Sequence, residues 1–382
     1  AVTLNLDGTL SAGGYAAGDI LLSIETAIGS SFNDIIVGSN SAETLNGMDG
    51  DDTISGNIGD DVINGGNGND TLSGGVGADI IDGGAGTDAL SYSTSTAGVT
   101  VYLDGVTLGT GGDAAGDRVS NVETLTGSSF NDILYGTAGA QSIFGGVGND
   151  ILDGGAGGDA LDGGTGTDSV SFLTSGSGIT ASFASGSLVI TGTDATGDSY
   201  VSIEGVIGSN FADSLTGGTS AETLDGGAGN DTIYGSLGAD ILTGGTGTDT
   251  IDYSASSAGV TISFATGVGS GGDAASDTLS GFEIAIGSAF ADSLTGGTGD
   301  DTLTGNGGDD IIDGGAGNDT LSGGAGNDTL TGGAGVDIID GGANADTVSY
   351  SGSASAVSAY LDGTLGVGGD AQSDTLTNIE NL

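Results

Sequence analysis

Acidic residues recur at intervals of nine along most of this 382-residue chain. Each is the sixth residue of a nine-residue phrase whose eighth residue is Leu, Ile or Val. Clear copies are Gly-Gly-Asn-Gly-Asn-Asp-Thr-Leu-Ser at residues 65–73 and Gly-Gly-Ala-Gly-Asn-Asp-Thr-Leu-Ser at residues 314–322. Carboxylates at so regular a spacing form an array of hard oxygen ligands, which favours a hard divalent cation such as calcium.

The phrase occurs 24 times in four blocks, and 23 copies carry Asp or Glu at the sixth position, the exception being Gln141. We predict that these acids are metal ligands. They are Asp34, Glu43, Asp52, Asp61, Asp70, Asp79 and Asp88 in the first block, Asp132, Asp150, Asp159 and Asp168 in the second, Asp213, Glu222, Asp231, Asp240 and Asp249 in the third, and Asp292, Asp301, Asp310, Asp319, Asp328, Asp337 and Asp346 in the fourth.

The phrase predicts a turn followed by a short strand. Gly at the first, second and fourth places tolerates positive φ and close backbone approach. The three residues around the aliphatic position form a short strand whose aliphatic side chain points inward. Two such units return the chain to its start, so one coil of the predicted solenoid has 18 residues. Residues 18 apart then stack at about 4.8 Å, which places Asp34, Asp52 and Asp70 in one row.

Such rows require a cation. Carboxylates about 5 Å apart in a partly dry groove repel one another by several kcal/mol per pair at an effective dielectric constant of about 20. Calcium suits the site because it accepts many oxygens in flexible geometry, whereas magnesium demands tighter octahedral geometry. Zinc and copper are poor candidates because the chain has no His and no Cys.

The phrase resembles the Gly-Gly-x-Gly-x-Asp-x-aliphatic-x nonapeptide of the repeats-in-toxin (RTX) proteins, whose fold is a calcium-loaded parallel β-roll. We therefore expect an all-β, right-handed parallel β-roll or β-solenoid of 18-residue coils. The resemblance implies that each calcium takes carbonyls and the acid of one turn, together with those of the turn 18 residues on. Acidic pairs at this separation number 15, so we expect about 15 calcium sites.

The entrances of the blocks depart from the pattern. Gln141 stands at a second phrase and marks a lost or weakened site, and Ser41 and Ser220 replace Gly in two other second phrases. We therefore expect weaker sites at the entrances than in mid-block. Phe replaces the fourth Gly of each opening phrase, and we expect the four rings to plug the core: Phe32, Phe130, Phe211 and Phe290.

The segments between the blocks resemble one another and carry alternating apolar residues, as at Val99, Val101 and Leu103, which is typical of strands. We interpret them as wider coils of one continuous solenoid. The predicted organisation is a partial interval at 1–28, a block of seven nonapeptides at 29–91, an interval at 92–126, a block at 127–171, an interval at 172–207, a block at 208–252, an interval at 253–286, a block at 287–349 and a partial interval at 350–382.

The intervals also carry recurring aromatic and acidic residues. An aromatic residue follows the last acid of each block, and we predict that it packs over the wider coil, with sugar stacking as the alternative: Tyr92, Phe172, Tyr253 and Tyr350. The acids form either a calcium site outside the roll or a solvated loop. They are Asp113, Asp117 and Glu123, recurring as Asp194, Asp198 and Glu204, as Asp273, Asp277 and Glu283, and as Asp370, Asp374 and Glu380.

Charge and composition exclude several functions. The formal net charge is −51 and Arg118 is the only basic residue, so the chain would repel nucleic acid. Self-repulsion predicts that folding depends on calcium. The chain contains no run of 18 apolar residues, so the sequence predicts no membrane-spanning helix. The chain has no His, Cys or Lys, and its equivalent acids form no pair with separated pKa values, so we expect no enzyme activity.

We expect a non-catalytic calcium-binding protein that forms an extracellular rod, filament or surface layer, with a rod length on the order of 100 Å. Residues 1–27 align with residues 356–382, which predicts head-to-tail continuation, either in a longer chain or between copies. A cell-surface polysaccharide is a further candidate partner. The alternative is a calcium-triggered secretion and folding module of a larger secreted protease, lipase or epimerase.

An ice-binding rod is a third hypothesis, disfavoured because the third position of the phrase varies. The RTX resemblance also implies type I secretion from a Gram-negative bacterium to its surface or surroundings.

Overall fold

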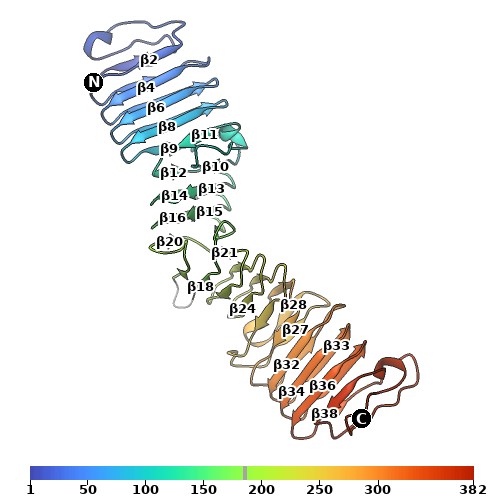
Figure 1. The fold of residues 1–382 in the computed structure, drawn as a ribbon. Helices are drawn as coiled ribbons and strands as arrows, with labels where there is room; N and C mark the ends of the chain where they lie inside the picture. Colours follow the sequence, from blue (N-terminus) through green and yellow to red (C-terminus); the bar gives the residue numbers. More distant parts are fainter. Residues whose placement is uncertain (184–186) are drawn as a thin grey trace. The chain divides into compact units, whose positions relative to one another are not determined.

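The computed structural model describes residues 1–183 and 187–382, which form short strands joined by turns (Figure 1). Within the described residues, the helical elements are four short 3₁₀ helices, η1 (Gly14–Ala16), η2 (Gly112–Ala114), η3 (Gly272–Ala274) and η4 (Gly369–Ala371). No helix in this part of the chain is long and apolar enough to cross a membrane. The chain divides into two compact units, one of Ala1–Ser175 with Gly192–Gly205 and one of Gly176–Thr191 with Val206–Leu382.

The first unit contains the first two nonapeptide blocks. Its strands are β1 (Thr3–Asn5), β2 (Thr26–Ile28), β3 (Ile35–Val37), β4 (Thr44–Asp49), β5 (Thr53–Ile58), β6 (Val62–Asn67), β7 (Thr71–Val76), β8 (Ile80–Ala85), β9 (Ala89–Ser91), β10 (Thr100–Tyr102), β11 (Arg118–Ser120), β12 (Thr124–Thr126), β13 (Ile133–Thr137), β14 (Ser142–Val147), β15 (Ile151–Gly155), β16 (Ala160–Thr165), β17 (Ser169–Ser171) and β20 (Ser199–Val201). One sheet has the order β1-β3-β5-β7-β9-β12-β14-β16-β20. The alternate strands pair as β11-β8-β6-β4-β2 and as β10-β13-β15-β17.

The second unit contains the last two blocks, and β21 (Gly205–Ile207) spans the sequence boundary between the units. Its strands are β18 (Thr180–Ser182), β19 (Val189–Thr191), β22 (Ser214–Thr216), β23 (Thr223–Asp225), β24 (Thr232–Tyr234), β25 (Ile241–Thr243), β26 (Thr250–Asp252), β27 (Thr261–Ser263), β28 (Val268–Ser270), β29 (Thr278–Ser280), β30 (Ile284–Ile286), β31 (Ser293–Thr295), β32 (Thr302–Gly307), β33 (Ile311–Ala316), β34 (Thr320–Ala325), β35 (Thr329–Ala334), β36 (Ile338–Ala343), β37 (Thr347–Val348) and β38 (Thr375–Thr377). One sheet has the order β19-β18-β22-β24-β26-β30-β32-β34-β36-β38, and the other contains β23-β25-β29-β28-β27-β31-β33-β35-β37.

The strand register confirms the 18-residue coil. Ile54 pairs with Leu72 in parallel register, and Leu72 pairs with Leu90 one coil later. Across the first interval Leu90 pairs with Leu125, so this coil is wider than those of the blocks. Each unit is thus a parallel β-roll with wider interval coils, as predicted. Whether all the predicted segments form one continuous solenoid stays a prediction.

The intervals widen their coil by a local reversal of the chain. In the interval at 253–286, β27 pairs antiparallel with β28, and β28 pairs antiparallel with β29. The opposite sheet continues without insertion, since β26 pairs directly with β30. The alternating side chains Val99, Val101 and Leu103 of the first interval are all buried, which confirms that this segment packs as part of the roll.

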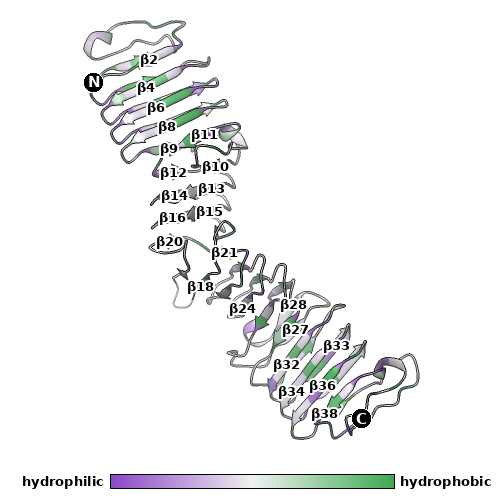
Figure 2. Ribbon diagram, in the orientation of Figure 1, coloured by the Kyte–Doolittle hydropathy of each residue, from purple (hydrophilic) through white to green (hydrophobic). Residues whose placement is uncertain are grey.

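The core is a stack of the eighth-position aliphatics, every one of which is no more than 2 % exposed. The apolar parts of β4, β6 and β8 lie at matching places in successive strands (Figure 2). Many block strands are longer than the predicted three residues, because pairing continues through the glycines that follow, as between Asn57 and Gly75. In the third block, β22 to β25 end after three residues.

Glycine is needed where coils approach closely. Gly66 has φ 114°, and a Cβ there would collide with the carbonyl of Met48 one coil earlier. A side chain at such a position is strained both by its own backbone and by its neighbour. The Gly pair of the phrase therefore sets how tightly successive turns stack.

The expectation that Phe rings plug the core at the block entrances is wrong. The side chains of Phe32, Phe130, Phe211 and Phe290 are all at least 45 % exposed. In three entrances the Phe N–H donates to a Ser hydroxyl two residues earlier, as from Phe130 to Ser128 over 3.1 Å. This tight turn lies at the edge of the roll, away from the stacked aliphatics, so the ring points outward.

By contrast, the aromatic residues that follow the last acid of each block are covered. Tyr92, Phe172 and Tyr253 are buried and Tyr350 is partly buried, as packing over the wider coils predicts.

The stacked core leads to a stability prediction. Leu321 is fully buried in β34, so Leu321→Ala should lower the free energy of unfolding by about 2–5 kcal/mol. Its neighbour Thr320 is exposed, so Thr320→Ala should change stability by no more than about 0.5 kcal/mol. Denaturant titrations at saturating calcium would measure both, and equal losses would contradict this account of the core.

Candidate metal centres

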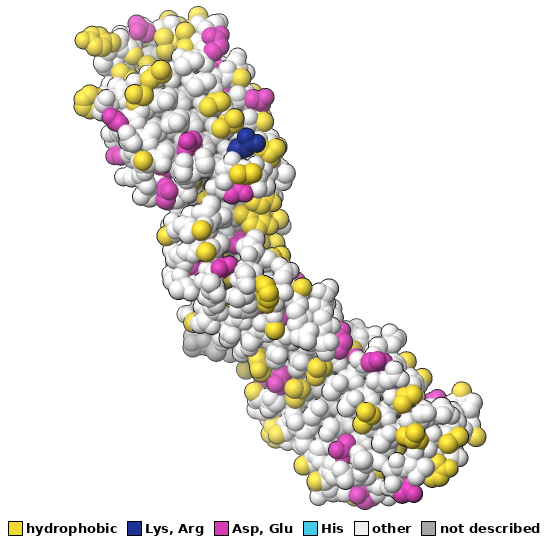
Figure 3. Space-filling model, in the orientation of Figure 1, with side chains coloured by type: hydrophobic (Ala, Val, Ile, Leu, Met, Phe, Trp, Pro, Cys, Tyr) yellow, Lys and Arg dark blue, Asp and Glu magenta, His cyan; other side chains and the backbone are white. Residues whose placement is uncertain are grey.

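The sixth-position acids lie in the turns just before the strands, and strand pairing arranges them in rows. The N–H of Asp52 donates to Oδ1 of Asp70 over 2.7 Å, and the N–H of Asp70 donates to Oδ1 of Asp88 over 2.7 Å. The same contact joins acids 18 residues apart in every block. All the sixth-position acids are buried, with no more than 5 % of any side chain exposed. Only scattered acidic side chains are therefore visible on the face drawn in Figure 3.

Many of these carboxylates have one oxygen with no partner. Among the described residues, sixteen sixth-position acids have a buried Oδ2 that takes no hydrogen bond. Leaving a buried polar atom unsatisfied is costly, and more so for a charged group. The acids are Asp52, Asp61, Asp70, Asp79, Asp88, Asp150, Asp159, Asp168, Asp231, Asp240, Asp249, Asp310, Asp319, Asp328, Asp337 and Asp346.

The unsatisfied oxygens face spaces lined by backbone carbonyls. A Cβ placed on Gly314 would lie 2.6 Å from the carbonyl oxygen of Gly332 and would collide with Oδ2 of Asp319. The first Gly of the phrase thus leaves room beside a carboxylate of its own turn and a carbonyl of the next coil. In the described part of the chain, no group of three or more acidic side chains is placed so that these side chains alone could hold a metal ion. Each site must therefore combine one or two carboxylates with carbonyls, a donor set that suits calcium.

Burial makes several of these carboxylates harder to ionise. It raises the pKa of Asp61 to about 6 and that of Asp240 to about 7. Burial likewise raises the pKa of Asp79 to about 7, and the nearby negative charge of Asp117 adds to the effect. A bound cation would stabilise the charged forms, since it replaces the lost hydration and offsets the repulsion between neighbours.

The first acid of each block is satisfied without a metal. Ser128 donates its N–H to Oδ2 of Asp132 over 2.5 Å and its hydroxyl to Oδ1 over 2.7 Å. Ser30, Ser209 and Ser288 bind the first acids of the other blocks in the same way. Although burial acts to raise the pKa of Asp34, hydrogen bonds from Ser30 and Val2 outweigh it and lower this pKa.

The second phrases also supply local donors to their acids or to Gln141. Gly297 donates its N–H to Asp301 over 2.6 Å, and Gly218 donates to Glu222 over 3.0 Å. Ser39 donates to Glu43, and Thr137 donates its N–H to Gln141 over 3.1 Å. That the entrance sites bind metal more weakly stays a prediction, which these contacts favour. For the first acids, the signal in the sequence was the Gly-Ser pair that begins each opening phrase and recurs in all four blocks.

The interval acids do not behave as one cluster. Asp117 accepts the N–H of Asp79 through Oδ1 and the hydroxyl of Tyr92 through Oδ2, both over 2.8 Å. Asp277 and Asp374 are bound in the same way by Tyr253 and Tyr350. In the second interval Phe172 replaces the tyrosine, and the hydroxyl of Tyr200 binds Asp198 instead. Asp113 instead donates its N–H to the hydroxyl of Ser95, and its negative charge acts on Asp79, so its position differs from that of Asp117.

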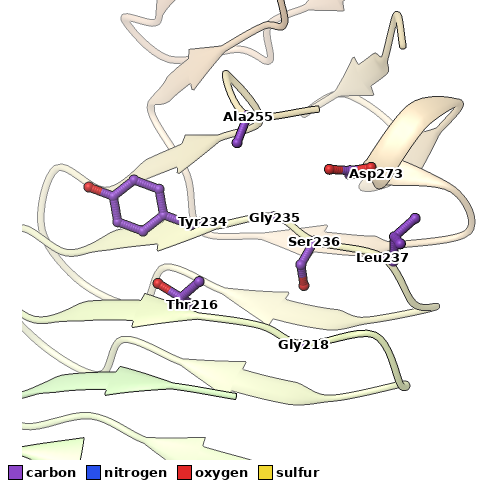
Figure 4. A pocket seen from close by; sticks show the side chains of 8 residues that line it. All are labelled: Thr216, Gly218, Tyr234, Gly235, Ser236, Leu237, Ala255 and Asp273. Carbon is purple, nitrogen blue, oxygen red and sulfur yellow. The ribbon is translucent and has the colours of Figure 1, made fainter. Parts of the chain in front are cut away.

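A hollow in the second unit offers a different environment. It has a volume of about 400 Å³ and is lined by Thr216, Gly218, Tyr234, Gly235, Ser236, Leu237, Ala255 and Asp273. Figure 4 shows Tyr234 and Asp273 at opposite ends of this hollow. Asp273 is the single acid among the lining residues, so the hollow does not bring together the paired carboxylates that glycoside hydrolysis needs.

The difference between row positions predicts unequal effects of substitution. Asp70→Ala removes a carboxylate that has an unsatisfied Oδ2 and stacked neighbours on both sides. It should weaken calcium binding at its sites by roughly tenfold or more. Asp34→Ala removes a carboxylate already bound by Ser30 and should have a smaller effect. Isothermal calorimetry would measure the affinities, and a larger effect of Asp34→Ala would contradict the ranking.

The raised pKa values predict that acid partly replaces calcium. A carboxyl group whose pKa is higher in the folded state than its ordinary value of 3.8 stabilises the fold when protonated, and this stabilisation is lost as pH rises through about 6 to 7. In EGTA, the circular dichroism of β structure should therefore be stronger at about pH 5 than at about pH 8. Calcium should remove most of this difference, and a metal-free spectrum independent of pH would contradict it.

Comparisons with known proteins agree with this geometry. A model of the RTX calcium-binding nonapeptide repeat matches residues 23–54, 55–90, 120–146, 135–170, 216–251, 286–321 and 314–348, which is more than half of the chain. No curated protein matches significantly. One similar solved structure is a hyperactive, Ca²⁺-dependent, β-helical antifreeze protein from an Antarctic bacterium, with 20 % identity over 86 % of this chain and 87 % of that one and a TM-score of 0.20. The chain belongs to the RTX calcium-binding nonapeptide-repeat family and binds multiple calcium ions.

Proposed function

We propose that this chain is a non-catalytic structural protein in which calcium stiffens a β-roll that forms part of an extracellular rod, filament or surface layer. The observation that carries the proposal is the repetition of one unsatisfied, buried carboxylate oxygen in coil after coil of all four blocks. Each is an equivalent ligand and none is set apart as a reactive group. Such uniformity suits a material whose stiffness is distributed along its length.

The charge of the chain supports a mechanical role for calcium. With a formal net charge of −51, the metal-free chain repels itself. Cations at the sixteen unsatisfied oxygens would remove more than half of that charge. Folding is then linked to the calcium concentration outside the cell, where calcium is abundant, since binding free energy becomes folding free energy. Synthesis in a low-calcium compartment followed by export would keep the chain unfolded until it is released.

Head-to-tail association is part of the proposal, and differences in burial support it. Ile24 is 36 % exposed, whereas the equivalent Val122 of the first interval is 3 % exposed beside the coil that precedes it. Leu382 is 58 % exposed, whereas the equivalent Leu125 is fully buried by the coil that follows. Head-to-tail stacking of two copies would cover these apolar residues, because the coil of one copy would lie against that of the next.

The test compares the chain in EGTA, in about 5 mM calcium and in about 5 mM magnesium, concentrations above the range that extracellular calcium modules require. Calcium alone should convert a disordered circular dichroism spectrum into one of β structure. It should also produce elongated assemblies in light scattering and electron microscopy, because the exposed segments stack once the coils are formed.

A spectrum unchanged by EGTA would overturn the role of calcium. Folding without assembly, giving a uniform monomer at saturating calcium, would overturn the structural role and favour the secretion and folding module of a larger enzyme. The double variant Ile24→Lys with Leu382→Lys is a matched control, since it should block assembly and leave calcium-dependent folding intact.

A further inference from the structure

The last acid of each block meets a glutamate from the following interval. The N–H of Asp88 donates to Oε2 of Glu123 over 2.8 Å, in the place where mid-block acids meet the acid 18 residues on. The contact recurs over 2.9 Å in the other three intervals. We call these residues the interval glutamates: Glu123, Glu204, Glu283 and Glu380.

The backbone holds each interval glutamate in register with its row. The carbonyl of Asp88 accepts the N–H of Glu123 over 3.1 Å and that of Thr124 over 2.8 Å. The carbonyls of Asp168, Asp249 and Asp346 accept the same pair of N–H groups in their intervals. The position of the glutamate therefore follows from main-chain contacts and does not depend on its own long side chain.

A carbonyl beside the glutamate closes the space next to the last acid. Two residues before Glu123, Asn121 has a left-handed backbone with φ 53°. A Cβ on Gly83 would lie 2.9 Å from Oδ2 of Asp88 and would collide with the carbonyl oxygen of Asn121. The same residue is left-handed in the other intervals, and its carbonyl faces the equivalent Gly, as Ser202, Gly281 and Asn378 do.

Left-handed backbone is unfavourable for Ser and tolerated by Asn, and its recurrence indicates a function for this carbonyl. The oxygen that it faces is unsatisfied. Asp88, Asp168, Asp249 and Asp346 are fully buried, and Oδ2 of each takes no hydrogen bond. The row contact of each interval glutamate uses Oε2, and Oε1 takes no part in it.

We propose that each interval glutamate completes a calcium site at the end of the block before it, with three kinds of oxygen: Oδ2 of the last acid, Oε1 of the glutamate and the carbonyl of the left-handed residue. The proposal rests on calcium binding by the rows and extends it to residues outside the nonapeptides. Two carboxylates at the site match the charge of one divalent cation. The row of calcium sites thus continues from the nonapeptide coils into the wider coil of the interval.

The other interval acids do not fit this role. Both oxygens of Asp117 are occupied, by the N–H of Asp79 and the hydroxyl of Tyr92. Asp113 lies in η2, where its N–H binds the hydroxyl of Ser95 and its charge acts on Asp79 of the other row. The glutamate is therefore the interval acid with an oxygen available beside an unsatisfied Oδ2.

The experiment counts bound calcium by equilibrium dialysis and atomic emission. A quadruple variant with Glu123→Gln, Glu204→Gln, Glu283→Gln and Glu380→Gln keeps an oxygen that can accept the row hydrogen bond but removes the charge. It should bind four fewer calcium ions per chain than the unchanged protein at calcium concentrations that saturate the mid-block sites. The matched control carries Asp113→Asn, Asp194→Asn, Asp273→Asn and Asp370→Asn in the same intervals, and it should bind the full number.

An unchanged calcium count in the glutamine variant, or an equal loss in the control, would overturn the proposal. If the unchanged chain bound no calcium, the proposed function itself would fail, which is a different result. Should the quadruple variant not fold, Glu283→Gln alone should lose one calcium ion with a normal circular dichroism spectrum, and retention of all ions would be decisive against the site.

Discussion

The structure depends on a carboxylate that is buried with only half of its oxygens satisfied. Oδ1 of Asp70 accepts an N–H from the coil before, while Oδ2 faces a space lined by carbonyl oxygen and takes no hydrogen bond. Burying an ionised group in this way is unfavourable unless it is protonated or meets a cation. The same side chain therefore holds adjacent coils together and, when ionised, favours a bound cation, which under the proposed function links coil formation to calcium binding.

The core and the metal rows share one register. The acid precedes the buried aliphatic by two residues, so the pairing that stacks Leu72 on Ile54 also stacks Asp70 on Asp52. A slip of one residue would turn the aliphatics outward and separate the acids from their N–H donors. The wider coils preserve this register by pairing Leu90 with Leu125, and their additional residues form the antiparallel excursions on one sheet.

The two ends of a block are chemically different. At the entrance, Ser128 donates hydrogen bonds to both oxygens of Asp132, so neither oxygen lacks a protein partner. At the exit, Asp168 retains an unsatisfied oxygen opposite the turn that carries Glu204. The first acid of a block therefore has protein hydrogen-bond donors for both oxygens, whereas the last acid keeps an oxygen without a donor. This polarity gives each row a direction along the chain, which a simple count of acids does not reveal.

The sequence alone determined the coil length, the buried aliphatics and the identity of the row acids, because these follow from a strict period of nine that repeats the same local contacts. It did not determine which acids keep an unsatisfied oxygen, nor that Phe32 points outward. Those properties depend on donors that are specific to each turn, such as Ser30, and on partners outside the period. Asp88 meets Glu123 across 35 residues, and Tyr200 takes the role that Phe172 cannot fill. Only the tertiary structure brings such residues together, since the interval loops break the period on which the sequence argument rests.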